Sequence, residues 1–127
     1  LDALCAKNRV GVLSNADDRS LQGVIATHGW TFDPVVSSER AKAYKPDPRI
    51  FAEFCKQANV EPEQVLYVGD STYDDVHGAK LMGMRAVHIP RDQTTPGRTP
   101  PPNATELLQA DLVIASLSEL VQALNTF

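Results

Sequence analysis

The stretch Val65-Leu66-Tyr67-Val68-Gly69-Asp70 decides the fold class, because a short apolar run ends abruptly at a glycine and an aspartate. A short apolar run that is bounded by turn residues is typical of a buried β-strand. An amphipathic segment follows from about Asp74 to Met82, and Gly83 closes it, which predicts a helix. The sequence therefore predicts a strand and then a helix, with a polar residue where the strand ends.

The same alternation extends from this stretch in both directions. We predict strands at Val10–Leu13, Val35-Val36, Val65–Val68, Arg85–Ile89 and Leu112–Ala115, and helices at Asp17–His28, from Pro48 onward, at Asp74–Met82 and at Leu117–Leu124. Strands that alternate with helices predict an α/β fold, a Rossmann-like parallel sheet flanked by helices. Ligands of such folds bind beyond the carboxyl ends of the strands. Ser14-Asn15 and Asp70, which end two of the strands, are therefore the first positions to examine for chemistry.

Length and composition limit the possible functions. With 127 residues, the chain is long enough for one domain and too short for two ordinary ones. The net charge of −4 argues against nucleic acid or an anionic membrane as a partner, and no apolar run has membrane-spanning length. Cys5 and Cys55 lie far apart without metal-ligand spacing, which favours reduced thiols in a cytoplasmic protein. The segment 90–103, rich in Pro, Thr and Gly, is predicted to be one long surface loop.

Two local patterns suit a bound anion. Ser14 and Asn15 stand between a strand and a helix, where their side chains, free N–H groups and the helix dipole favour a phosphate. An ordinary helix cap explains these two residues as well, and better when the pattern is taken alone. Lys45 precedes Pro46 and Pro48, which stiffen the approach to the next helix, so its ammonium could neutralise a phosphate or a carboxylate. A solvated surface lysine is an equally good interpretation of that pattern.

The third pattern is an acidic cluster. Asp70 follows Gly69, which permits a sharp turn, and Asp74 and Asp75 complete three carboxylates within six positions. Oxygen ligands of this kind suit Mg²⁺. A place in the first helical turn accounts for Asp74 or Asp75, but less well for Asp70 at the end of an apolar strand. A metal site is therefore the better interpretation of this cluster.

Together and in this order, the patterns resemble those of the haloacid dehalogenase-like hydrolase superfamily. The resemblance extends from about Val10 to Leu120 and rests on three groups of residues: Val10–Asn15; Lys45–Pro48 with Ile50-Phe51; and Val68–Ser71 with Asp74-Asp75 and Gly78-Ala79. Each motif is weak alone, whereas their order and spacing are specific.

The resemblance implies roles for these residues. Ser14, with Asn15 beside it, would bind the substrate phosphate, and Lys45 would balance the charge of nucleophile and phosphate, which makes Ser14 and Lys45 the candidate catalytic residues. Asp70 would be a Mg²⁺ ligand, and Asp75 would close or support the metal site through water or Lys45. Family members that cleave carbon–halogen bonds need no metal and tend to lose the Gly-Asp pair that precedes Ser71. The intact pair therefore implies a Mg²⁺-dependent phosphatase acting on a small phosphate monoester through an aspartyl-phosphate.

One motif of the family is absent. Its Asp-x-Asp motif supplies the nucleophile and the general acid and base, but no two aspartates here are separated by a single residue. In the family, that motif lies on the first, central strand, between the strands that would end at Ser14 and Asp70. Residues 1–9 are too few and too polar to form it, and the chain begins at Leu1 rather than methionine. We therefore expect residues 1–127 to be an incomplete core domain, the C-terminal portion of a hydrolase, with no separate cap domain. Its two bare strand edges should recruit another strand or self-associate.

Three hypotheses follow. In the first, the chain is part of a phosphatase and hydrolyses a small phosphorylated substrate only when an N-terminal segment, or a self-associated copy, completes it. In the second, it is a non-catalytic fragment or binding module that keeps the anion and metal sites. The third, a phospho-accepting receiver domain, fits poorly because the order Ser, Lys, Asp is not that of receivers. The motifs favour descent from a phosphatase, as in the first hypothesis. The sequence does not decide whether this polypeptide itself acts as in the first hypothesis or the second.

Overall fold

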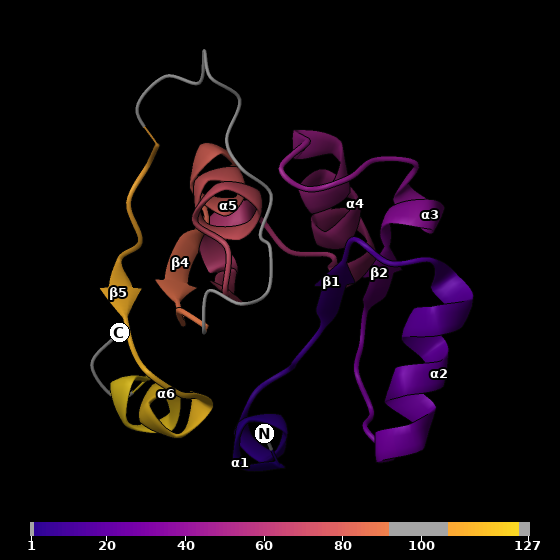
Figure 1. Ribbon diagram of the computed structural model, residues 1–127, viewed down its shortest axis with the longest axis horizontal. Coiled ribbons are helices and arrows are strands. Elements are labelled where there is room, and N and C mark those ends of the chain that lie inside the picture. Colours follow the sequence, from indigo (N-terminus) through magenta and orange to yellow (C-terminus); the bar gives the residue numbers. More distant parts are fainter. Residues whose placement is uncertain (1, 92–106, 125–127) are drawn as a thin grey trace.

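Strands and helices alternate along residues 2–91 and 107–124, which the computed structural model describes (Figure 1). The strands are β1 (Val12–Ser14), β2 (Val35–Ser37), β3 (Leu66–Gly69), β4 (Arg85–His88) and β5 (Leu112–Val113). The α-helices are α1 (Asp2–Lys7), α2 (Asp18–His28), α3 (Ser38–Ala41), α4 (Pro48–Ala58), α5 (Gly78–Leu81) and α6 (Leu117–Ala123). A 3₁₀-helix at Pro62–Gln64 precedes β3, and a π-helix at Thr72–His77 continues directly into α5. The predicted α/β class is confirmed.

The strands form two parallel sheets instead of one. β1 pairs with β2, with Leu13 opposite Val36, while β3 pairs with β4 and β4 with β5. Within the described ranges, no ladder joins β1 to β3. This strand order agrees with the expectation that these two strands are not neighbours in a continuous sheet.

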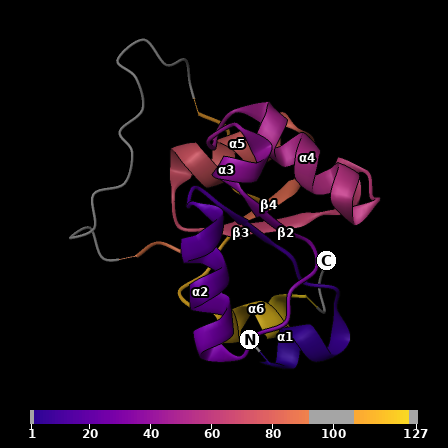
Figure 2. The same cartoon turned by 90° about the vertical axis from the view of Figure 1, so that its right-hand side faces the viewer.

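Helices cover both faces of the strands (Figure 2). α3, α4 and α5 lie on one face, and α1, α2 and α6 lie on the other. On the second face, Leu4 of α1 and Leu120 of α6 pack with Val87 of β4 in a small apolar core. No described helix is both long and apolar enough to cross a bilayer.

The larger core lies under α4 and holds the two sheets together. Ile50 and Phe51 of α4 are fully buried there. They share the core with Val36 of β2 and Ala86 of β4, which belong to different sheets. Side-chain packing through this helix layer therefore joins the sheets where main-chain pairing does not.

Capping residues that can be recognised in the sequence set the helix boundaries near the strand ends. Asp17 accepts a hydrogen bond from the Ser20 N–H at 3.0 Å and so begins α2, and Gly29 ends that helix with a φ of 67°. Asp47 caps α4, whose first residue is Pro48. These boundaries match the sequence-based expectation and place the polar residues after β1 directly before a helix.

Some boundaries differ from that expectation. The helix predicted from Asp74 begins at Thr72 as a π-helix, because Ser71 caps it and accepts a hydrogen bond from the Asp74 N–H at 3.0 Å. β1 begins at Val12, two residues later than predicted, and residues 2–7 form α1, which is too short to show a periodicity. From residue 92 onward, the predicted loop 90–103 lies outside the described residues.

Candidate active site

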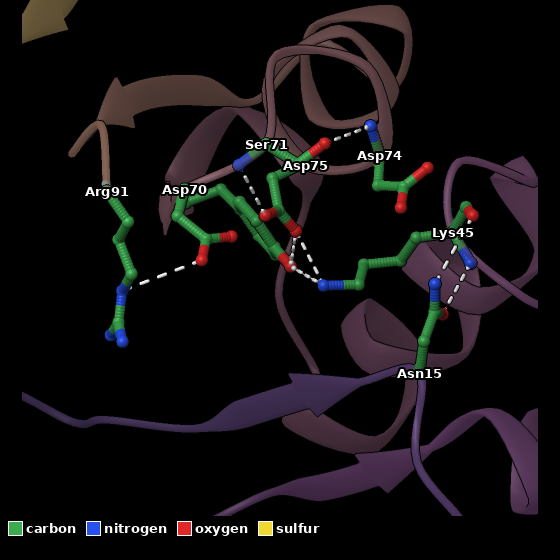
Figure 3. A network of polar contacts seen from close by, with 8 residues as sticks. Asn15, Lys45, Asp70, Ser71, Asp74, Asp75 and Arg91 are labelled. Atoms are coloured by element: carbon green, nitrogen blue, oxygen red, sulfur yellow. Dashed lines mark hydrogen bonds and ion pairs between the residues drawn. The ribbon is translucent and has the colours of Figure 1, made fainter. Parts of the chain in front are cut away.

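Candidate residues that are far apart in the sequence meet at the carboxyl ends of β1 and β3 (Figure 3). Ser14 is the last residue of β1, and Asp70 follows the last residue of β3. Lys45 reaches this region from the loop between α3 and α4. The fold thus places a hydroxyl, an ammonium and a carboxylate at the edge where parallel α/β folds bind ligands.

Lys45 and Asp75 form a nearly buried ion pair. Nζ of Lys45 donates to Oδ1 of Asp75 at 2.5 Å, and the two side chains are 13% and 6% exposed. Oδ1 of Asp75 also accepts from the Tyr67 hydroxyl at 2.9 Å, and Oδ2 accepts from the Ser71 N–H at 3.1 Å. Because three donors converge on one carboxylate, Asp75 is fixed in place and its charge balances that of Lys45.

Asn15 is engaged with the main chain of Lys45. Its Oδ1 accepts from the Lys45 N–H at 2.7 Å, and its Nδ2 donates to the Lys45 carbonyl at 3.4 Å. The carboxamide therefore ties the residue after β1 to the loop that carries the lysine. Because the Asn15 side chain is engaged in this way, an anion would bind the main-chain N–H groups that follow Ser14 rather than the Asn15 carboxamide.

Asp70 differs from Asp75 in its surroundings. Its side chain is 52% exposed and forms an ion pair with Nε of Arg91 at 3.5 Å, on a side chain that is 77% exposed. An exposed pair of this length contributes little stability. Of the two carboxylates expected to serve a metal, Asp70 is thus the accessible one.

Gly69 and the π-helix bring Asp75 back against the end of β3. A Cβ atom at position 69 would collide with the Asp75 carboxyl group, so only glycine permits this approach. Asp74, which precedes Asp75 in the π-helix, is also buried. The missing side chain at position 69 therefore lets the Asp75 carboxylate pack against the end of β3, where it meets Lys45.

The Tyr67 hydroxyl stays protonated in this setting. Its burial and the nearby charge of Asp75 raise the pKa of Tyr67 well above its usual value, because both disfavour a phenolate. The hydroxyl also accepts a hydrogen bond from Nζ of Lys45 at 3.2 Å. A neutral phenol thus contacts both the ammonium and the carboxylate, which also contact each other.

A divalent cation could use part of this donor set. Among the residues that the structure describes, no three His, Cys, Asp or Glu side chains are grouped so as to hold a metal ion. Mg²⁺, however, is often bound by only one or two protein carboxylates together with water and substrate oxygens. The half-exposed carboxylate of Asp70 fits that requirement, whereas three donors already occupy Asp75.

A groove of about 600 Å³ lies between the two sheets. Residues 10–13 line one wall, residues 65–68 line the other, and Leu4, Leu120 and Leu124 contribute from α1 and the α6 end. The groove lies beside β1 and β3, and neither Ser14 nor Asp70 is among its lining residues. Its lining is mostly apolar, which suits a buried polypeptide segment better than a polar ligand.

The groove also exposes main-chain groups of both strands. The Val10 carbonyl and the Val12 N–H bond toward β2, and the Val65 and Gly69 carbonyls bond toward β4. Because main-chain groups alternate along a strand, those of residues 11, 13, 66 and 68 point into the groove. Both walls therefore present hydrogen-bonding edges to whatever lies between them.

The sequence did not single out two residues of this site. Tyr67 was predicted only as part of an apolar strand, and Arg91 only as part of a surface loop. Tyr67 stands two residues before Gly69, and residues two apart in a strand point to the same face. A tyrosine at that position is therefore a signal by which the sequence could have indicated a hydroxyl at the site. Nothing in the sequence marks Arg91.

The fold and the site define an α/β domain with a polar site at the ends of its parallel strands. The family model of the haloacid dehalogenase-like hydrolases matches residues 1–89, and the chain belongs to that family. It is 34% identical over 119 residues to the human haloacid dehalogenase-like hydrolase domain-containing protein 3, covering 92% of this chain and 45% of the relative. The family resemblance suggested by the motifs is confirmed.

Relatives with different activities are about equally similar. One is (S)-2-haloacid dehalogenase 1 of Pseudomonas sp., 31% identical over 89% of this chain and 47% of the relative. Another is the glyceraldehyde 3-phosphate phosphatase of Pyrococcus furiosus, 34% identical over 74% of this chain and 37% of the relative.

Solved structures confirm the fold. The crystal structure of a phosphatase of this family from Thermococcus onnurineus aligns with a TM-score of 0.78 and 29% identity over 97% of this chain and 54% of that one. The chain spans about half the length of the relatives it matches.

Proposed function

We propose that this chain is the C-terminal portion of a Mg²⁺-dependent phosphatase that hydrolyses a small phosphate monoester. The observation that carries the proposal is the buried ammonium of Lys45, held by Asp75 at the strand ends beside Ser14 and Asp70. A lysine with its counter-ion in such a position suits an anionic substrate with more than one negative charge. The accessible Asp70, which follows Gly69, favours phosphate-ester hydrolysis over the metal-free cleavage of carbon–halogen bonds.

In this proposal, the residues after β1 and Lys45 bind the phosphate. The Ser14 hydroxyl and the N–H groups from Asn15 onward donate to phosphate oxygens at the N-terminal side of α2, where the helix dipole favours negative charge. Lys45 neutralises charge that builds up on the phosphoryl oxygens. The Asn15 carboxamide keeps Lys45 close to Ser14 through its main-chain hydrogen bonds.

Asp70 would hold the Mg²⁺, and Asp75 would support the site through Lys45. A bound Mg²⁺ neutralises phosphate charge and orients the ester for attack. Asp75 contributes by holding the Lys45 ammonium in place through its hydrogen bond. We also propose a cytoplasmic location, because Cys5 and Cys55 are free thiols, one exposed and one buried.

The nucleophile would come from an extended segment that occupies the groove and carries Asp-x-Asp. One oxygen of its first aspartate attacks phosphorus, the bond to the ester oxygen breaks, and the second aspartate gives that oxygen a proton. Water then attacks the aspartyl-phosphate, the second aspartate takes a proton, and inorganic phosphate leaves. Support comes from the two edges that face the groove and from the half-length match to the relatives. The segment belongs to the same protein or to another copy.

Reconstitution tests this function. The chain is mixed with a peptide that carries Asp-x-Asp between valine and isoleucine residues, and phosphate release from a panel of small monoesters is measured with and without Mg²⁺. We expect hydrolysis with this peptide, and none with its Asn-x-Asp counterpart or with the Lys45→Met chain. Hydrolysis that survives Lys45→Met would contradict the proposed role of the lysine.

The second candidate function is a non-catalytic binding module that keeps the anion and metal sites. The observation that favours it is the lack of an Asp-x-Asp pair in the sequence, beside an ion pair that is fully formed. The same mixture distinguishes the two functions. Binding of peptide and inorganic phosphate without any release of phosphate from esters would support the module.

A further inference from the structure

We propose that Arg91 is a counter-ion that competes with Mg²⁺ for the carboxylate of Asp70, so that Arg91 leaves Asp70 when the metal binds. The inference rests on the proposed function, in which Asp70 holds the metal. Neither the motifs nor the similarity to relatives assigns Arg91 a role.

The carboxylate of Asp70 already has a cation beside it. Its Oδ2 lies 3.5 Å from Nε of Arg91, and Figure 3 shows the two side chains facing each other. A carboxylate that is paired with a guanidinium is a poorer ligand for a metal ion, because the two cations repel each other and are attracted by the same negative charge. Arg91 and a bound Mg²⁺ therefore weaken each other's interaction with Asp70.

The pair between Asp70 and Arg91 can open at low cost. The two side chains are 52% and 77% exposed, so water can solvate the guanidinium once it leaves. The pair between Lys45 and Asp75 differs, because its side chains are 13% and 6% exposed and its atoms lie 2.5 Å apart. Of these two pairs at the strand ends, the one at Asp70 is the one that a cation from solution can replace.

Other contacts hold the main chain at Asp70. Nε2 of His88 donates to the Asp70 carbonyl at 3.2 Å, and the Ile89 N–H donates to the Gly69 carbonyl at 3.0 Å. Both contacts join the end of β3 to the end of β4 without Arg91. Replacing Arg91 should therefore change the charge beside the Asp70 carboxylate and leave the path of the main chain unchanged.

The first readout is the NMR signal of the Arg91 Nε–H in the 127-residue chain, assigned through its loss in Arg91→Gln. The chain is titrated with MgCl₂ at constant ionic strength. We expect the signal to move, with saturation, to the position that it has in Asp70→Asn, where the pair is absent. The Arg49 signal is the matched control, because Nε of this 72% exposed side chain meets the Asp47 carboxylate at 3.2 Å. It should stay in place, whereas Mg²⁺ acting only as a salt would move both signals.

The second readout is the affinity for Mg²⁺, measured from the amide signals of residues 69–71 in the same titration. Arg91→Gln should raise this affinity about threefold, the effect of removing one exposed ion pair, and Arg49→Gln should not change it. A threefold gain without loss of stability separates a competing charge from a structural role.

Two results would overturn the proposal while the metal site stands. In one, Mg²⁺ binding is lost in Asp70→Asn, but the Arg91 signal of the unmodified chain does not move. In the other, the affinity of Arg91→Gln is unchanged or lower. If Mg²⁺ binds equally well to Asp70→Asn, or does not bind to the unmodified chain, the metal assignment of the proposed function is wrong, and the competition at Asp70 is overturned with it.

Discussion

Replacing Asp75 with asparagine tests the nearly buried ion pair directly. Asp75 is 6% exposed and accepts from Lys45, Tyr67 and Ser71 at 2.5, 2.9 and 3.1 Å. An asparagine side chain has one acceptor oxygen, so its amide N–H₂ must face either the Ser71 N–H or the Lys45 and Tyr67 donors. The substitution therefore removes a charge and turns one hydrogen bond into a contact between two donors.

The magnitude follows from the burial of the partner. Removing one member of a buried pair takes from the other charge, here the 13% exposed Lys45, the carboxylate that it pairs with, and costs about 3 kcal/mol. Part of that cost is the unsatisfied donor, which alone costs about 1–3 kcal/mol. Urea-induced unfolding followed by circular dichroism measures the change in the free energy of unfolding.

Asp33→Asn is the matched control for this measurement. Asp33 pairs with Arg9 at 3.4 Å, but the two side chains are 79% and 51% exposed. Water screens such a pair, so its loss should cost less than about 1 kcal/mol. If Asp75→Asn costs no more than Asp33→Asn, the buried network does not stabilise the fold and the reasoning is refuted.

Three further outcomes are expected. Gly69→Ala should destabilise the chain by at least about 2 kcal/mol in the same urea assay, because the new Cβ collides with the Asp75 carboxyl group. Gly23→Ala should instead stabilise it by about 0.5–1 kcal/mol, because Gly23 lies in an exposed turn of α2 and nothing is near its added Cβ. A main-chain N–H of β4 and then Lys80 lower the pKa of Asp111, so its contribution to stability is fully present above about pH 4 and lost as the pH falls through the lowered value. Asp111→Asn should therefore flatten the decline of the unfolding free energy below about pH 4, and an unchanged acid profile would contradict this.

The sequence predicted the strand ends better than the contacts made there. Ser14 and Asp70 were expected at one edge because polar residues follow apolar strands and a parallel fold brings such ends together, whereas Lys45 was expected there from the family resemblance. Helix boundaries at Asp17 and Pro48 were predicted correctly because capping depends on neighbouring residues alone.

Contacts between distant segments could not be predicted in the same way. Whether the Asn15 carboxamide meets a phosphate or the Lys45 main chain depends on the path of the loop after α3, which no local pattern encodes. Tyr67 has the pattern of an ordinary strand aromatic, and only the fold shows that its hydroxyl lies between two charges. The π-helix was missed because its start depends on the Ser71 cap and on space at Gly69.

The division of the sheet has a consequence for amide hydrogen exchange. Packing under α4, more than a hydrogen-bonded ladder, sets the separation of β1 and β3, and side-chain packing is less directional than main-chain pairing. The amides of Leu13 and Val68 that face the groove should exchange fast, while those paired within each sheet exchange slowly. An inserted strand would protect both edges together, so the two half-sheets would change from separately opening units into one cooperative unit.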